Sequence, residues 1–89
     1  MKHAREDYTR RIQDSAHLIP VEEPVFLLRS TDQVAAQAVR SWAHLHRQNG
    51  GSDVAYELAM KQADLMEAWG KKYGTKPADC PPNALVPGV

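Results

Sequence analysis

Residues 30–70 read STDQVAAQAVRSWAHLHRQNGGSDVAYELAMKQADLMEAWG. Apolar residues recur at three- and four-residue spacing before and after Gly50 and Gly51, a pattern typical of two amphipathic helices. The first stripe comprises Val34, Ala35, Ala38, Val39, Trp42 and Leu45, and the second comprises Val54, Leu58, Leu65 and Trp69. Because the connection between them is so short, we expect a mainly α fold built on an antiparallel helical hairpin.

Capping residues mark the ends of both helices. Residues 30–33 have capping-box spacing, a serine followed three residues later by glutamine, and predict that the first helix begins at residue 30. Residues 49–51 (NGG) predict its end, because glycine readily adopts the left-handed conformation of a C-cap. Either Ser52 or Asp53 caps the second helix, which we expect to end at Gly70.

Residues 17–29 (HLIPVEEPVFLLR) differ from the hairpin, because their two prolines exclude a helix. Residues 25–28 (VFLL) predict one short buried strand that precedes the hairpin. Its backbone groups need partners, and residues 18–19 and 85–86, both next to proline, are the candidates within the chain. We expect pairing with a second copy instead, which gives a homo-oligomer, either a dimer or a tetramer. The alternative is an irregular extended arm packed over its own hairpin.

The composition divides the chain into three parts. Residues 1–16 form a charged arm with Tyr8 and Ile12 as its only sizeable apolar groups, and we expect it to be mobile or to form a short helix against a partner. Residues 17–74 form the strand and hairpin domain. Residues 75–89 form a proline-rich tail, either draped over the hairpin or loose.

Charge and length narrow the classes of function. Eleven basic and eleven acidic side chains cancel, so we expect no DNA partner. No apolar run approaches the roughly 20 residues that cross a bilayer, so we expect no membrane association. Cys80 is the only cysteine and we find no export signal, which indicates a cytoplasmic protein. A chain of 89 residues without a disulfide or zinc usually needs a partner subunit.

The sequence lacks a catalytic or metal-binding pattern. His44 and His46 are two positions apart on a predicted helix and point to nearly opposite sides, so they cannot share a metal ion. Cys80 has no neighbouring base that would activate it. The hairpin is too small to enclose two catalytic carboxylates in a cleft. We therefore expect a non-enzymatic protein with no catalytic residue, metal or cofactor.

Arg29 lies where the predicted strand meets the predicted helix. Free backbone N–H groups and a guanidinium converge at such a position, which suits an anion such as phosphate. Alternatively, Ser30 and Asp32 use those amides themselves, or Asp32 pairs with Arg29. Trp42 and Trp69 lie on the apolar stripes, so we expect core packing, with stacking on a flat ligand as the alternative.

Several of these segments resemble a large group of very small phage and prophage proteins. The similarity lies in residues 23–32 (EPVFLLRSTD), in Trp42, in residues 66–69 (MEAW) and in residues 76–79 (KPAD), and it covers roughly residues 19–80. The group resembles the anti-CBASS sponge family, whose members oligomerise and sequester cyclic nucleotide immune signals. The resemblance implies a phage anti-defence protein, in the cytoplasm of the infected bacterial host, that binds cyclic di- or oligonucleotides without cleaving them.

The same resemblance implies a set of ligand-binding residues. Phe26, Arg29 and Asp32 match the shared motif, and Arg40 and Trp42 join them from the following helix. Arg29 would suit phosphates, and Asp32 would accept from a base edge or orient Arg29. A competing hypothesis is a small protein that inhibits or adapts a host protein through an exposed apolar helix face. A third is a hydrolase of the same signals.

Overall fold

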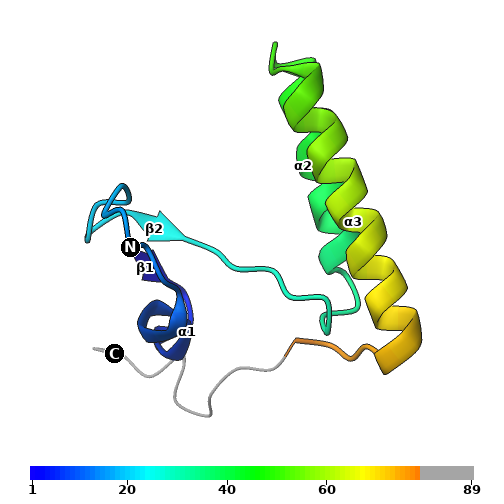
Figure 1. Cartoon of the computed structure of the whole chain (residues 1–89). Coiled ribbons are helices and arrows are strands. Elements are labelled where there is room, and N and C mark those ends of the chain that lie inside the picture. The colour runs from blue at the N-terminus through cyan, green and yellow to red at the C-terminus, as the bar shows by residue number, and fades with distance from the viewer. Residues whose placement is uncertain (79–89) are drawn as a thin grey trace. The chain divides into compact units, whose positions relative to one another are not determined.

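The computed structural model describes residues 1–78, which form two compact units, Met1–Leu27 and Leu28–Ala78. The elements in chain order are β1 (Lys2–His3), α1 (Glu6–Arg11), β2 (Pro24–Val25), α2 (Ala35–Gln48) and α3 (Asp53–Tyr73) (Figure 1). The first three belong to the first unit, and the two long helices belong to the second. The N-terminal residues pair with β2 within the first unit.

The mainly α fold and the helical hairpin are confirmed. Helices α2 and α3 run antiparallel and pack along their length (Figure 1). The turn between them follows its local sequence, since Gly50 has a φ of 83° just after the end of α2. Ser52 caps α3 as expected, because its hydroxyl accepts a hydrogen bond from the Ala55 amide at 3.1 Å.

The predicted start of α2 at residue 30 is wrong. The helix begins at Ala35, and Val34 occupies its N-cap position. The Gln33 amide donates to the carbonyl of Lys76 at 3.0 Å, and the Lys76 amide donates to the carbonyl of Thr31 at 2.9 Å. Residues 31–33 therefore pair with the chain that follows α3 instead of starting a helix. Through this contact the beginning of the tail packs against the hairpin, as one of the two expectations had it. Residues 79–89 of the tail lie outside the described part of the chain.

The predicted end of α3 at Gly70 is also wrong. The helix continues to Tyr73, and Gly74 follows it with a φ of 91°. Gly70 is buried, and a Cβ added to it would lie 2.7 Å from Thr75 Cγ2 and 3.5 Å from the Ser30 carbonyl oxygen. The glycine leaves room for the Thr75 side chain, which follows the helix and packs against this position.

The contact between α2 and α3 is made by small side chains. The buried residues of the two helices are Ala35, Ala43, Ala63, Met66 and Gly70. Within residues 1–78 no large side chain is fully buried. Trp42 is 51% exposed and Trp69 is 41% exposed, so the expectation that both pack in the core is wrong for the single chain. Alanine and glycine let the helix backbones approach closely and leave the large apolar side chains outside.

The first unit is built on a pairing that the sequence analysis missed. β1 and β2 pair in parallel, with Lys2 opposite Pro24 and His3 opposite Val25. The Lys2 amide donates to the Glu23 carbonyl at 2.7 Å, and the Met1 amino group donates to the carbonyls of Pro20 and Val21. The N-terminal arm is therefore ordered within its own chain.

This pairing corrects the prediction for residues 25–28. The strand is limited to Pro24–Val25, and within the chain it pairs with β1. Phe26 is 70% exposed in the single chain, so the predicted burial of this run is wrong as well. Residues 26–29 continue as irregular chain toward the hairpin.

Candidate ligand-binding site

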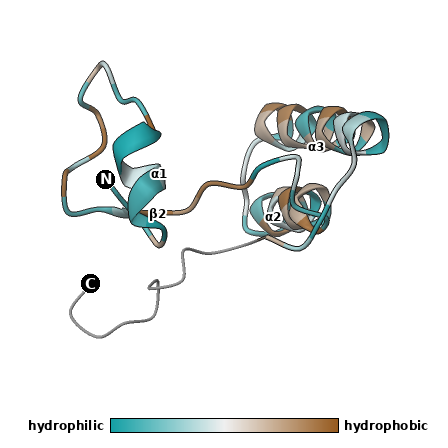
Figure 2. Cartoon of the chain, turned by 90° about the horizontal axis from the view of Figure 1, so that it is seen from below, coloured by the Kyte–Doolittle hydropathy of each residue, from teal (hydrophilic) through white to brown (hydrophobic). Residues whose placement is uncertain are grey.

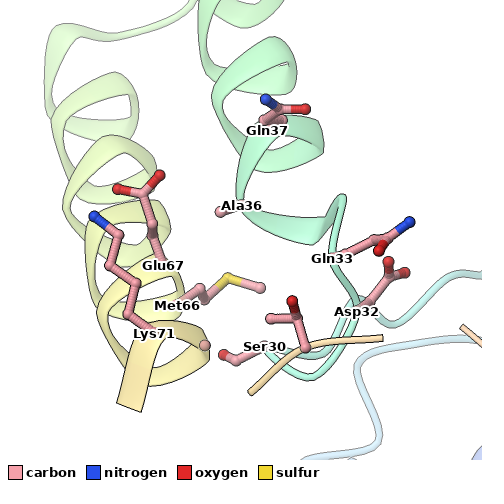
Figure 3. Close-up of a pocket in the computed structure, with 10 residues that line it drawn as sticks. Ser30, Asp32, Gln33, Ala36, Gln37, Met66, Glu67 and Lys71 are labelled. Carbon is pink, nitrogen blue, oxygen red and sulfur yellow. The ribbon is translucent and has the colours of Figure 1, made fainter. Parts of the chain in front are cut away.

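A cavity lies in the second unit, between the start of α2 and the last turns of α3. Its volume is about 280 Å³. Polar side chains line it from three segments: Ser30, Asp32 and Gln33 from the loop before α2, Gln37 from α2, and Glu67 and Lys71 from α3 (Figure 3). Met66 and Gly70 add an apolar part of the lining. The arrangement provides both donors and acceptors around a small space.

The loop that forms one wall is held by its own hydrogen bonds. Asp32 Oδ1 accepts from the Val34 amide at 3.0 Å, and the Ala35 amide donates to the Asp32 carbonyl at 3.1 Å. The parallel bridge between Asp32 and Lys76 fixes the same loop against the segment after α3. These contacts fix Asp32 and Gln33 at the cavity before any ligand binds.

These hydrogen bonds also test the predicted anion site beside Arg29. The prediction that free backbone amides bind the anion is wrong, because the amides of residues 32–35 all donate hydrogen bonds within the chain. The competing interpretation, in which the loop uses these amides itself, is therefore correct for Asp32. An anion at this position would therefore be bound by cationic side chains, and Lys71 lines the cavity.

An ion-pair cluster borders the cavity. Arg40 of α2 contacts the Asp64 carboxylate at 2.9 Å and the Glu67 carboxylate at 3.4 Å, both on α3. The hydrogen bond to Asp64 raises the pKa of Arg40, and the bond to Glu67 adds to the same effect. Arg40 thus joins the two helices through ion pairs. Its predicted role in ligand binding remains a prediction, but in this structure its guanidinium already has two carboxylate partners.

The predicted ligand-binding residues lie in different places. Asp32 lines the cavity, and Arg29 is an exposed residue that precedes Ser30 of the lining. Trp42 is not among the lining residues, and its ring stacks on His46 with centroids 4.8 Å apart. Of the five, the structure therefore places only Asp32 in the cavity wall.

Phe26 belongs to the other unit. Its ring stacks on the buried His3 with centroids 4.7 Å apart, and His3 also meets the Tyr8 ring edge-on at 5.0 Å. One face of Phe26 is therefore used to cover His3. Its large exposed fraction leaves surface for a further contact.

Of the residues that line the cavity, the sequence predicted only Asp32 as a ligand-binding residue. Gln33 was assigned to a capping box, while Gln37 and Lys71 were given no binding role. Gln33 lies in the loop before α2 and Gln37 lies in its first turn, so a helical spacing does not relate them. Lys71 was not predictable, because its position depends on how α3 packs.

The chain was compared with known proteins, and its helices were checked for length and apolar character. No protein-family model matches the chain, and no curated protein or solved structure is significantly similar to it. Among residues 1–78, no helix combines the length and the apolar character needed to cross a membrane.

Proposed function

We propose that the protein binds and sequesters a cyclic di- or oligonucleotide immune signal without cleaving it. The observation that carries the proposal is the polar cavity of about 280 Å³ beside Asp32. Ligand sites commonly measure about 300–1,000 Å³, so this cavity suits one nucleobase-sized group rather than a whole cyclic dinucleotide. In this proposal one base of the ligand enters the cavity and the rest of the ligand lies outside it.

The chemistry of the lining supports a nucleobase. Gln33 and Gln37 each carry an amide that both donates and accepts, which matches the mixed donors and acceptors of a base edge. Met66 offers a polarizable thioether to the face of a base. Lys71 in the lining and Arg29 beside it supply positive charge for phosphates.

The state of the two carboxylates supports sequestration rather than cleavage. Asp32 Oδ1 accepts from the Val34 amide, and Glu67 is paired with Arg40. A general base must be free to approach the proton that it removes, and both groups already have structural partners. A role as a phage anti-defence factor in the bacterial cytoplasm rests on the resemblance of residues 23–32, which contain Asp32, to the sponge family.

The test is calorimetric titration with cyclic di- and trinucleotides of adenine and guanine, followed by heat release and chromatography of the ligand. We expect tight binding of at least one of these nucleotides and its recovery intact. The variants Gln33→Ala and Gln37→Ala should each weaken binding at least about tenfold, since each removes hydrogen bonds to the base. Gln48→Ala is the matched control, because Gln48 is an exposed residue at the other end of α2.

Each alternative result has a clear meaning. A chemically changed nucleotide would replace sequestration with hydrolysis. Absence of binding across the whole set would contradict the proposal, and equal weakening by Gln48→Ala would contradict the assignment of the cavity.

A second candidate function is direct contact with a host protein, which the protein would inhibit or adapt. The exposed apolar side chains of the hairpin favour it, among them Trp42, Leu45 and Leu58. It predicts that the purified protein binds no nucleotide and that a defined host protein binds to this helix surface in a reconstituted mixture.

A further inference from the structure

The apolar side chains that the hairpin leaves exposed are found on both helices. On α2 they include Trp42 and Leu45, and on α3 they include Leu58, Leu65 and Trp69. We call the surface formed by these five residues the apolar side. Figure 2 colours the chain by hydropathy and shows apolar positions on each of the two helices.

The ion pair between Arg40 and Asp64 shows that the apolar positions of α2 turn away from the charged groups. These two residues are in contact across the hairpin, so they mark one side of it. Successive residues of a helix are about 100° apart, which places Trp42 and Leu45 roughly 140–160° around α2 from Arg40. The buried Ala43 lies between Arg40 and Trp42 on the way around the helix.

The same construction holds for α3. Trp69 lies roughly 140° around this helix from Asp64, and the buried Ala63 and Met66 lie on the longer way around between the two. Leu58 shares the same stripe as Trp69. Because α2 and α3 are antiparallel, both stripes lie on the same side of the hairpin, opposite the side marked by the ion pair.

The apolar side is large enough to form an interface. Leu45, Leu58 and Leu65 are 58%, 63% and 64% exposed. Aromatic side chains carry about 150–250 Å² each, so the two half-exposed tryptophans offer on the order of 200 Å², to which the three leucines add. Val34, Val54 and Tyr73 extend the exposed apolar surface along the same helices. The total is of the order of the roughly 800 Å² that each partner contributes to a standard interface.

The buried positions of the hairpin form only a small core. Its buried positions are alanines, one methionine and one glycine, and the large apolar groups lie outside. A helix pair must bury its apolar stripe against another layer. A second copy supplies the same uncharged side chains in the same pattern, and a two-fold axis brings the two apolar sides together with every charged group of the ion-pair cluster kept outside.

We propose that the apolar side is the docking surface for a second copy of this chain, so that two hairpins form a four-helix arrangement. This inference names the surface that holds the copies together, and that surface is a helical one rather than the strand. It does not depend on the nucleotide. Trp42 and Trp69 of both chains are buried in the interface, while the cavity beside Asp32 remains on the outside.

The experiment compares two pairs of substitutions by light scattering. Leu45→Lys/Leu58→Lys places two lysines on the apolar side, and His44→Lys/Glu57→Lys places two lysines at the preceding, exposed positions. We expect the wild-type chain and the control to form the same oligomer. We expect Leu45→Lys/Leu58→Lys to weaken self-association at least about a hundredfold, because like charges would be buried at a two-fold interface. Circular dichroism should show the same helix content in both variants.

The proposal is overturned by a wild-type chain that is monomeric at every concentration, or by Leu45→Lys/Leu58→Lys keeping the wild-type mass. Dissociation of the control to the same extent would also overturn it. Nucleotide titration of the same samples distinguishes the two proposals. Loss of binding in a wild-type chain that still associates contradicts the proposed function alone, and binding by a monomeric wild-type chain contradicts this inference alone.

Discussion

The two sides of the hairpin show how differently one pair of helices can be used. On the side marked by Arg40, charged groups pair across the helices and polar side chains surround a cavity. On the apolar side, two tryptophans and three leucines are exposed. Between them lies a contact made of alanine, methionine and glycine. In the proposed assembly, the polar side is complete in one chain and the apolar side is completed by a second copy.

The largest effect is expected from a change in the contact between the two sides. Ala63 is fully buried between the helices, so Ala63→Leu would force them apart. Overpacking of this kind costs about 1–3 kcal/mol, and we expect the free energy of unfolding to fall by that amount. Urea denaturation measures it. Ala68→Leu, at an exposed position of the same helix, should change stability little, and a similar loss there would contradict the close packing.

A gain on the apolar side would sharpen the comparison further. Gln62 is exposed and lies four residues from Leu58 and three from Leu65, on the same stripe of α3. Gln62→Leu adds apolar surface to both copies in a two-fold interface, so self-association should strengthen about tenfold. Sedimentation equilibrium gives the association constant. If Gln62→Leu left it unchanged or lowered it, the stripe would be outside the interface.

The cap of α3 provides a change that belongs to neither side. Ser52→Ala removes the hydrogen bond to the Ala55 amide and should lower the free energy of unfolding by about 1 kcal/mol. Thermal unfolding followed by circular dichroism measures it. At temperatures where the chain stays folded, nucleotide binding and self-association should be unchanged, which separates loss of fold from loss of either surface. Ser41→Ala, in the exposed middle of α2, is the control.

The smallest effect is expected from the ion-pair cluster. Arg40→Met removes the contacts to Asp64 and Glu67 and retains most of the side-chain volume. Ion pairs near the surface contribute little, and salt weakens them further. We expect Arg40→Met to lower the melting temperature less than Ser52→Ala does. We also expect this drop to disappear in high salt. A drop that high salt leaves unchanged would assign Arg40 a packing role instead.

The sequence predicted those parts of the fold that depend on local signals. The turn at Gly50, the cap at Ser52 and the two antiparallel helices each have a short-range physical cause, and each is confirmed. The burial of Trp42 and Trp69 was predicted wrongly, because an apolar spacing identifies a helical face without identifying what covers it.

The error at the start of α2 has a non-local origin, because residues 31–33 pair with Lys76, far along the chain. The end of α3 instead follows a local signal, since Gly74 has a φ of 91° directly after Tyr73. At the cavity, Asp32 belongs to a sequence motif and was therefore predictable. Lys71 belongs to no motif, and only the packing of α3 brings it to the cavity.

The most direct test of the different use of the two sides is iodide quenching of tryptophan fluorescence as a function of protein concentration. Both tryptophans lie on the apolar side, so the signal needs no assignment to one of them. If a second copy covers this side, the tryptophans will be shielded at high concentration and become accessible on dilution. Full accessibility at every concentration would contradict the assembly of the chain through its apolar side.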